Sequence, residues 1–255
     1  MDLAIQTQAL SRSYGDFHAV RALELRVERG SFYGFLGPNG AGKSTTIRML
    51  TGLLAPSAGS IRVLGLDPSD PDQALTMKAR IGVVPEDLAL FDNLTAREFL
   101  IFVGRMHSMP KDTLLGRITE LLELLNLDQE AKKLTVEFSY GMRKKLALAA
   151  ALLPDPDLLF LDEPFEGVDA IASRTIRRIL TSFVERGSTV FMTSHVLEIV
   201  ERVCDHVGII VGGALVEQTS IVDLAGSSLE QRFLEVAGAD LVERPQLSWL
   251  ENGAG

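Results

Sequence analysis

Residues 37–45 combine glycines, a lysine and two hydroxyl side chains in an order suited to binding phosphate. They read Gly-Pro-Asn-Gly-Ala-Gly-Lys-Ser-Thr, the spacing of a phosphate-binding loop. Glycines let the backbone curl so that successive N–H groups point toward phosphate oxygens. Lys43 is placed to reach the β- and γ-phosphates, and Ser44 to ligate Mg²⁺. The predicted nucleotide-binding residues of this loop are Gly37, Pro38, Asn39, Gly40, Ala41, Gly42, Lys43, Ser44 and Thr45.

The elements on either side of this loop favour the same interpretation. A strand is predicted over residues 32–36 and a helix over residues 44–54, so the loop leads from a strand into a helix N-terminus. That helix end carries roughly half a positive charge, which attracts anions. The alternative, a chance glycine-rich turn, does not require either element.

Two acidic residues follow a short apolar run later in the chain. Residues 158–161 read Leu-Leu-Phe-Leu, typical of a buried strand, and Asp162 and Glu163 come directly after it. Open α/β sheets place ligand chemistry at this end of their strands. Asp162 would hold Mg²⁺, commonly through water, and Glu163 would act as the general base on the attacking water. Without the phosphate loop, the pair could equally be an acidic turn.

Three further residues could contact an anion. His195 follows a strand predicted over residues 189–193 and could donate to a γ-phosphate or to the attacking water; the alternative is a structural histidine. Ser139 suits the N-cap of a helix predicted over residues 142–153, and Gly141 permits close backbone approach. A plain capped helix explains these two equally well. A solvated helix face likewise explains the basic residues 143–145 as well as a phosphate site does.

The elements that must position these residues alternate between strand and helix, which predicts an α/β fold with a mostly parallel sheet. The N-terminal third contains short strand-like runs and would add an antiparallel β portion, whereas residues 87–156 have helical spacing. We expect one nucleotide-binding domain over residues 1–238. It would comprise a β lobe (residues 1–86 and 157–220) and an inserted helical lobe (87–156), followed by a C-terminal extension (221–255) whose end frays.

Composition excludes several classes of function. The chain has 255 residues and a formal net charge of −9, so binding of nucleic acid through phosphate neutralisation is not expected. A single cysteine excludes a disulfide framework and a cysteine-rich zinc site. The N-terminus lacks the pattern of a secretory signal. The longest apolar runs, residues 146–153 and 207–216, fall short of the roughly 20 residues that span a bilayer. Work at a membrane would require another, spanning chain.

In this order, the motifs closely resemble the nucleotide-binding subunit of an ABC transporter, a P-loop NTPase, from the first strands to about residue 238. The resemblance implies a head-to-tail dimer, formed by two copies or with a sister chain, in which each ATP lies between the phosphate loop of one subunit and the signature helix of the other. Ser139 and Gly141 would contact the ATP of the partner. Tyr14 stands where the aromatic residue of the family stacks on adenine; the alternative is an ordinary packed tyrosine. Residues 167–169 resemble the D-loop at the dimer interface.

Two motifs depart from the usual pattern of the family. Phe138, Tyr140 and Met142 replace the Leu, first Gly and Gln of a signature that usually reads Leu-Ser-Gly-Gly-Gln. Glu86 replaces the glutamine of the Q-loop; its carboxylate is a hard oxygen ligand for Mg²⁺, so it is predicted to bind nucleotide and metal. These replacements, with residues 228–234, resemble the ABC-2 export subgroup.

The resemblance implies an ATPase that binds ATP and Mg²⁺ and works through dimer closure, hydrolysis and reopening. Closure would drive transport through a separate transmembrane permease, which would contact the groove near residues 86–95 and hold the chain at the cytoplasmic face of the membrane. Two alternatives remain open at this point. One is a soluble ABC-type ATPase that acts on ribosomes or DNA, and the other is a regulatory subunit with weak hydrolysis.

Overall fold

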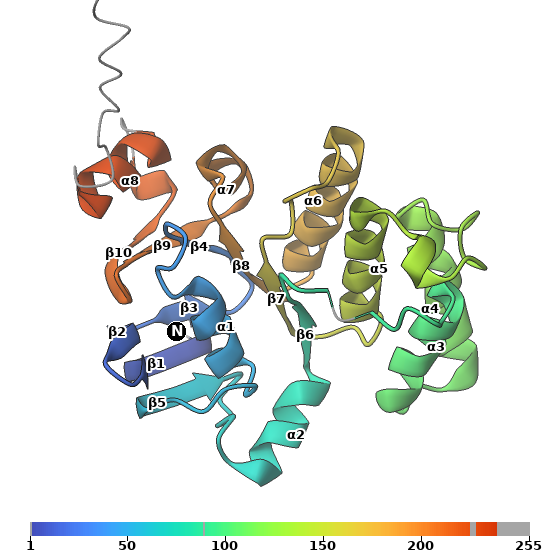
Figure 1. Ribbon diagram of the computed structural model, residues 1–255, viewed down its shortest axis with the longest axis horizontal. Coiled ribbons are helices and arrows are strands. Elements are labelled where there is room, and N and C mark those ends of the chain that lie inside the picture. Colours follow the sequence, from blue (N-terminus) through green and yellow to red (C-terminus); the bar gives the residue numbers. More distant parts are fainter. Residues whose placement is uncertain (1, 89, 225–227, 239–255) are drawn as a thin grey trace, which may run out of the picture.

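The computed structural model describes residues 2–88, 90–224 and 228–238, and its strands form two sheets (Figure 1). The smaller sheet is antiparallel and is built around one long strand, β1. A left-handed residue, Ala9 (φ 45°), interrupts the regular pairing of β1. The strands of this sheet are β1 (Leu3–Tyr14), β2 (Phe17–Leu23), β3 (Arg26–Glu28) and β5 (Ala58–Val63).

The larger sheet has six strands in the order β10-β9-β4-β8-β7-β6; the strands from β9 to β6 are parallel to one another, and β10 pairs antiparallel with β9. Leu36 pairs with Ser194, and Asp162 pairs with Thr193, so the carboxyl ends of β4, β7 and β8 lie at one edge. The predicted α/β class with a mostly parallel sheet is therefore confirmed. The strands are β4 (Phe32–Leu36), β6 (Ile81–Val84), β7 (Leu158–Asp162), β8 (Thr189–Ser194), β9 (His206–Val211) and β10 (Ala214–Ser220).

Helices surround the larger sheet, and three of them pack together at one side of the molecule (Figure 1). These three are α3, α4 and α5, and α5 also contacts β6, which joins this group of helices to the sheet. The helices are α1 (Lys43–Leu50), α2 (Pro71–Ala79), α3 (Ala96–Met106), α4 (Lys111–Leu124), α5 (Tyr140–Leu152), α6 (Ala170–Glu185), α7 (Leu197–Val203) and α8 (Leu229–Ala237), with short 3-10 helices at Thr135–Glu137 and Val222–Leu224.

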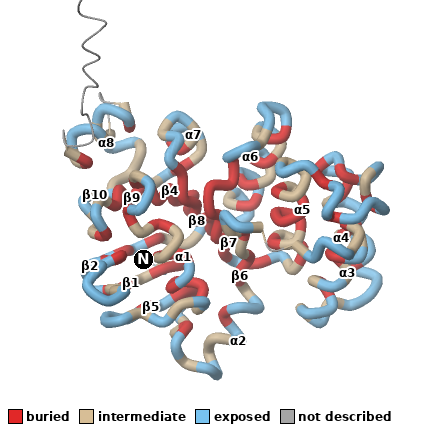
Figure 2. Tube along the Cα trace, in the orientation of Figure 1, coloured by how far each residue is buried: buried red, intermediate tan, exposed pale blue. Residues whose placement is uncertain are grey.

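Apolar side chains cover both faces of the larger sheet, and the central strands are the most deeply buried part of the chain (Figure 2). Along β8, Val190 and Met192 enter the core beneath α5 and α6, while Phe191 enters the core shared with the antiparallel sheet. Phe191 stacks on Tyr33 with 5.5 Å between ring centroids and packs against Phe160 at 5.7 Å. Burial on both faces explains why these strands read as continuous apolar runs.

Several element boundaries differ from the sequence prediction. Helix α1 ends at Leu50, four residues early, because Gly52 takes a left-handed conformation (φ 69°) that a helix cannot continue through. Helix α5 begins two residues earlier than predicted, directly after its N-cap Ser139. Helix α2 was not predicted at all. Residues 239–255 of the predicted C-terminal extension lie outside the described residues. Among the residues described, no helix combines the length and apolarity needed to cross a membrane.

Candidate active site

A cavity of about 430 Å³ lies at the carboxyl edge of the larger sheet, where the predicted phosphate loop leaves β4. The loop forms one wall, and the residues that follow β6, β7 and β8 form the others. The topology thus gathers motifs that are more than a hundred residues apart in the sequence. The lining residues are Phe17, Ala19, Asn39, Gly40, Gly42, Lys43, Ser44, Thr45, Glu86, Asp162, Glu163, Glu166 and His195.

The backbone of the loop requires glycine at two close approaches. Gly42 has a φ of 105°, and a Cβ added there would lie 2.4 Å from the carbonyl oxygen of Ala19. A Cβ on Gly37 would lie 2.4 Å from the carbonyl oxygen of Ile210. The glycines therefore let the loop pass close to neighbouring backbone before it enters α1. Gly37, Pro38 and Ala41 shape this loop but do not line the cavity.

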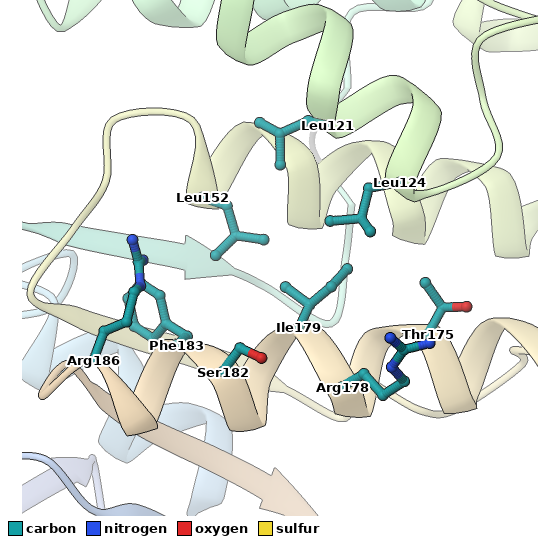
Figure 3. A pocket seen from close by; sticks show the side chains of 9 residues that line it. All are labelled: Leu121, Leu124, Leu152, Thr175, Arg178, Ile179, Ser182, Phe183 and Arg186. Atoms are coloured by element: carbon teal, nitrogen blue, oxygen red, sulfur yellow. The ribbon is translucent and has the colours of Figure 1, made fainter.

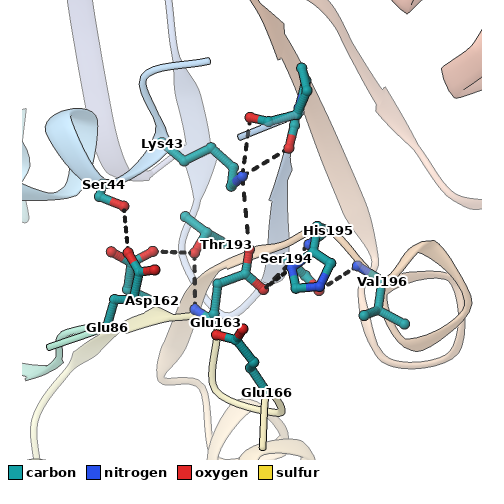
Figure 4. Close-up of polar contacts among 12 residues, drawn as sticks. Lys43, Ser44, Glu86, Asp162, Glu163, Glu166, Thr193, Ser194, His195 and Val196 are labelled. Carbon is teal, nitrogen blue, oxygen red and sulfur yellow. Dashed lines mark hydrogen bonds and ion pairs between the residues drawn. The ribbon is translucent and has the colours of Figure 1, made fainter. Parts of the chain in front are cut away.

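Lys43 is buried, with 7% of its surface exposed, at the wall of this cavity. Its Nζ donates to the carbonyl oxygen of Gly37 at 2.8 Å and lies 3.8 Å from Oε1 of Glu163 (Figure 4). The ammonium group thus stands between the phosphate loop and the acidic side chain that directly follows β7. A cation in this place can attract phosphate oxygens and also balance the charge of Glu163.

Asp162 and Glu163 are both buried and are linked through one hydroxyl group. Thr193 donates from Oγ1 to Oδ1 of Asp162 at 2.5 Å and accepts from the backbone N–H of Glu163 at 3.1 Å (Figure 4). Glu163 itself has a φ of 50°, an uncommon conformation for a residue with a side chain. This backbone turns its carboxylate toward Lys43 and His195, away from the end of the strand.

His195 contacts the carboxylate of Glu163 twice. Its Nδ1 lies 3.0 Å from Oε2, and its backbone N–H donates to the same oxygen at 3.3 Å. The carboxylate of Glu163 therefore has a partner on each side, Lys43 and His195, while it still lines the cavity. A carboxylate held in this way can accept a proton from a water molecule in the cavity.

Hard oxygen donors also lie together at this cavity. The hydroxyl of Ser44 lies 3.5 Å from Oε2 of Glu86, and Asp162 lines the same cavity. The described residues contain no group of three or more His, Cys, Asp or Glu side chains able to hold a metal. A donor set of one hydroxyl and two carboxylates fits Mg²⁺, which usually keeps several waters and takes its remaining oxygens from substrate phosphates.

Ser139 and Gly141 do not line this cavity. Ser139 caps α5 by accepting from the backbone N–H of Met142 at 3.3 Å. The next residue, Tyr140, lines a neighbouring hollow that shares Glu86 and Glu166 with the cavity. The start of α5 therefore lies beside the cavity of its own subunit but outside it.

Tyr14 also lies outside the lining of the cavity, and an aromatic residue missed by sequence reasoning takes part instead. Tyr14 pairs with Phe17 across the hairpin, and Phe17, 62% exposed, lines the cavity. The guanidinium of Arg12 lies 4.6 Å from the centre of the Tyr14 ring. Ala19 and Glu166 are the other lining residues that were not predicted. Ala19 lies within β2, and Glu166 follows the acidic pair, but only the tertiary structure brings them here.

A second cavity, of about 320 Å³, lies between α4, α5 and α6 (Figure 3). Its lining is largely apolar, with Leu121, Leu124, Leu152, Ile179 and Phe183 pointing into it. No residue of the phosphate loop and neither residue of the acidic pair lines it. The groups able to act on phosphate are therefore at the first cavity.

Comparison with known proteins finds one family model, described as ABC transporter, that matches residues 20–166. The bacitracin transport ATP-binding protein BcrA of Bacillus licheniformis is 42% identical over 219 residues, covering 86% of this chain and 70% of that protein. The Nod factor export ATP-binding protein I of Paraburkholderia xenovorans is 38% identical over 261 residues, covering 97% of this chain and 84% of that protein.

A solved structure shares the fold of nearly the whole of this chain. It is described as the ATP-binding subunit of an ABC transporter and superimposes with a TM-score of 0.86 at 27% sequence identity. The superposition covers 92% of this chain and all of the other. The matched family segment includes the phosphate loop, the start of α5 and the acidic pair, the motifs around which the site is built.

Proposed function

The chain belongs to the ABC transporter family of ATP-binding proteins, and on that premise we propose that it hydrolyses Mg-ATP in the 430 Å³ cavity to drive export. Members of this family are transport ATPases, and this chain is such an ATP-binding subunit. The observation that carries the proposed site is the carboxylate of Glu163, buried beside the phosphate loop between Lys43 and His195.

Each residue of the site has a distinct part in this proposal. The loop N–H groups and Lys43 bind the phosphates of ATP, and Glu163 accepts a proton from the attacking water. His195 holds the carboxylate of Glu163 and orients it toward that water. Ser44, Asp162 and Glu86 would hold Mg²⁺, which when bound offsets the negative charge of the phosphates. The adenine would rest near Tyr14 and Phe17, where an aromatic stack is worth about 1–3 kcal/mol.

A second subunit completes the site in this proposal. Ser139 and Gly141 stand at the N-terminal end of α5, an anion-attracting position, but outside the cavity of their own chain. In a head-to-tail dimer, they would contact the γ-phosphate of the ATP held by the partner. The partner would be a second copy or a sister chain.

A separate transmembrane permease would supply the path for the substrate. The two relatives are named for bacitracin transport and Nod factor export, which supports export as the direction. The permease would contact residues 86–95, between the larger sheet and α3, and would keep this chain at the cytoplasmic face of the membrane. Co-purification of a tagged chain from detergent-solubilised membranes tests this. A multi-span protein in near-equal amount is expected, and recovery without one contradicts the transport role.

Glu163→Gln tests the general base. The variant keeps the size of the side chain but cannot take up a proton, so turnover should fall about 10²–10⁴-fold, roughly 3–5 kcal/mol of barrier. ATP binding should persist. The control is Glu185→Gln at the exposed end of α6, which makes the same chemical change outside the site. Near-normal phosphate release by Glu163→Gln would remove Glu163 from the role of base.

Lys43→Ala tests the phosphate loop. It removes the cation at the wall of the cavity, so tight nucleotide binding should be lost. Titration with a fluorescent ATP analogue measures this directly, with Lys111→Ala on α4 as the control for loss of an exposed lysine. Unchanged affinity in Lys43→Ala would refute the assignment of residues 37–45 to phosphate binding.

A further inference from the structure

Lys144 is a lysine in the interior of the protein. It lies one turn into α5, and only 2% of its surface is exposed. Its Nζ donates to the carbonyl oxygen of Glu166 at 2.8 Å and also to the carbonyl oxygen of Glu163. Burial lowers the pKa of Lys144 below its ordinary value, and nearby carboxylates, Glu166 first, act in the opposite direction. Burying an ammonium group costs free energy unless the group is hydrogen-bonded. Here both hydrogen bonds go to the same turn of backbone, residues 163–166.

That turn carries the proposed general base. Glu163 has a left-handed backbone (φ 50°), a strained conformation that persists only where its surroundings hold it. Both backbone polar groups of Glu163 are held: its N–H donates to Thr193, and its carbonyl accepts from Lys144 and from the backbone N–H of Glu166. The direction of the Glu163 carboxylate therefore depends on where α5 places Lys144.

The same lysine also contacts the exposed first residue of α5, Tyr140. Its Nζ lies 5.3 Å from the centre of the Tyr140 ring. That ring packs against Gly167, where a Cβ would come within 2.6 Å of it. Ser139, the N-cap of the helix, directly precedes Tyr140. The first turn of α5, the turn over residues 163–167 and the base thus form one packed unit.

We propose that Lys144 is a positioning residue that transmits contact at the start of α5 to the backbone of Glu163 in the same subunit. This rests on the proposed function, in which Ser139 and Gly141 meet the ATP of the partner. When the partner's ATP binds at the start of α5 and shifts this helix, Lys144 moves with it. Its hydrogen bonds to the carbonyls of Glu163 and Glu166 then shift the turn that contains the base. Each subunit then aligns its own base when it holds its partner's nucleotide, so turnover is cooperative in ATP.

Lys144→Met tests this, because methionine fills similar space without donating a hydrogen bond. Turnover should fall on the order of 100-fold, the effect of a small misplacement of a reacting group, while affinity for a fluorescent ATP analogue stays unchanged. The Hill coefficient for ATP should fall from above one to one. Lys144→Arg, which keeps the cation and several donors, should recover part of both. The matched control, Lys111→Met on the surface of α4, should match the unsubstituted protein in all three readouts.

The result that overturns the proposal is a folded Lys144→Met protein with normal turnover and normal cooperativity. A loss of turnover that merely follows lost ATP affinity and a lower melting temperature, with no recovery in Lys144→Arg, would also overturn it in favour of a structural role. If Lys144→Met does not fold, Lys144→Gln, which keeps an N–H donor, should give intermediate turnover with affinity intact; full turnover would again overturn the proposal.

Glu163→Gln measured in parallel separates this inference from the proposed function. If Glu163→Gln hydrolyses ATP normally, the assignment of the base fails, whatever Lys144 does. If Glu163→Gln is inactive while Lys144→Met is fully active and cooperative, the base stands and only the inference about Lys144 fails.

Discussion

Thr193 organises both members of the acidic pair through a single hydroxyl group. It donates to Asp162 and accepts from the backbone N–H of Glu163, and it has no exposed surface. Thr193→Val keeps the shape of the side chain and removes both hydrogen bonds. Stability should fall by about 1–3 kcal/mol, because a buried N–H loses its partner, and turnover should fall with it because Glu163 is less well held. Urea unfolding and ATPase assays measure the two effects.

Thr189 offers a matched control on the same strand. It is 1% exposed, and its hydroxyl accepts from the backbone N–H of Gly30 at 3.0 Å, at the other end of β8. Thr189→Val should lose comparable stability with turnover per folded molecule unchanged. Equal losses of turnover in both variants would mean that Thr193 matters only for folding.

Site residues that belong to a motif can be predicted from the sequence. Residues that reach the cavity only through the tertiary structure cannot. Lys43 and Glu163 stand at fixed positions beside a loop or a strand, so their neighbourhood could be predicted. Phe17 and Glu166 reach the cavity only because a hairpin and a turn fold over it. Lys144 belongs to the basic residues 143–145, which a solvated helix face and a phosphate site explain equally well, because the sequence does not tell which side of α5 faces the turn after β7.

At the scale of elements, Asp169 begins α6 and gives that helix a pH-dependent cap. The backbone N–H of Ala172 donates to its carboxylate at 2.9 Å, as does that of Ile171, and these bonds lower the pKa of Asp169 below its ordinary value. Because the folded pKa is the lower one, the stabilisation is present above the unfolded pKa of about 3.9 and is lost as pH falls through the folded pKa.

Asp169→Ala should therefore lower the melting temperature at neutral pH, and the deficit relative to the unsubstituted protein should shrink below about pH 4. Asp169→Asn keeps an acceptor for the cap but cannot titrate, so its stability should not change with the protonation of this position. Melting temperatures measured across this range test both variants. A deficit of the same size in acid would show that the charge of Asp169 plays no part.

The elements that could not be predicted have physical reasons for being missed. Helix α2 buries only Met77, so it lacks an apolar stripe; its cap Asp70, followed by Pro71 at the first helical position, was the available signal. Strand β1 extends far beyond its first apolar residues. The sequence pattern does not reveal this length, because Ala9 breaks the alternation of inward-facing positions. By contrast, residues 158–161 were predictable because a fully buried parallel strand leaves a continuous apolar run.

At the scale of the whole molecule, one chain supplies most but not all of the proposed ATP site. The sheet edge brings the phosphate loop, the acidic pair and His195 to one cavity. The N-terminus of α5, with Ser139 and Gly141, remains outside that cavity. Two subunits are therefore needed around each nucleotide, with Glu163 of one chain acting on an ATP that the partner also holds.

Light scattering of Glu163→Gln, with and without Mg-ATP, tests this claim most directly. The variant should hold ATP without consuming it, so we expect a dimer with bound ATP when Mg-ATP is present and a monomer when it is absent. Adding Lys43→Ala to the same chain should abolish the dimer. A Glu163→Gln protein that binds ATP fully yet stays monomeric at every concentration, alone and with any sister chain that co-purifies with it, would show that one subunit is enough to hold the nucleotide.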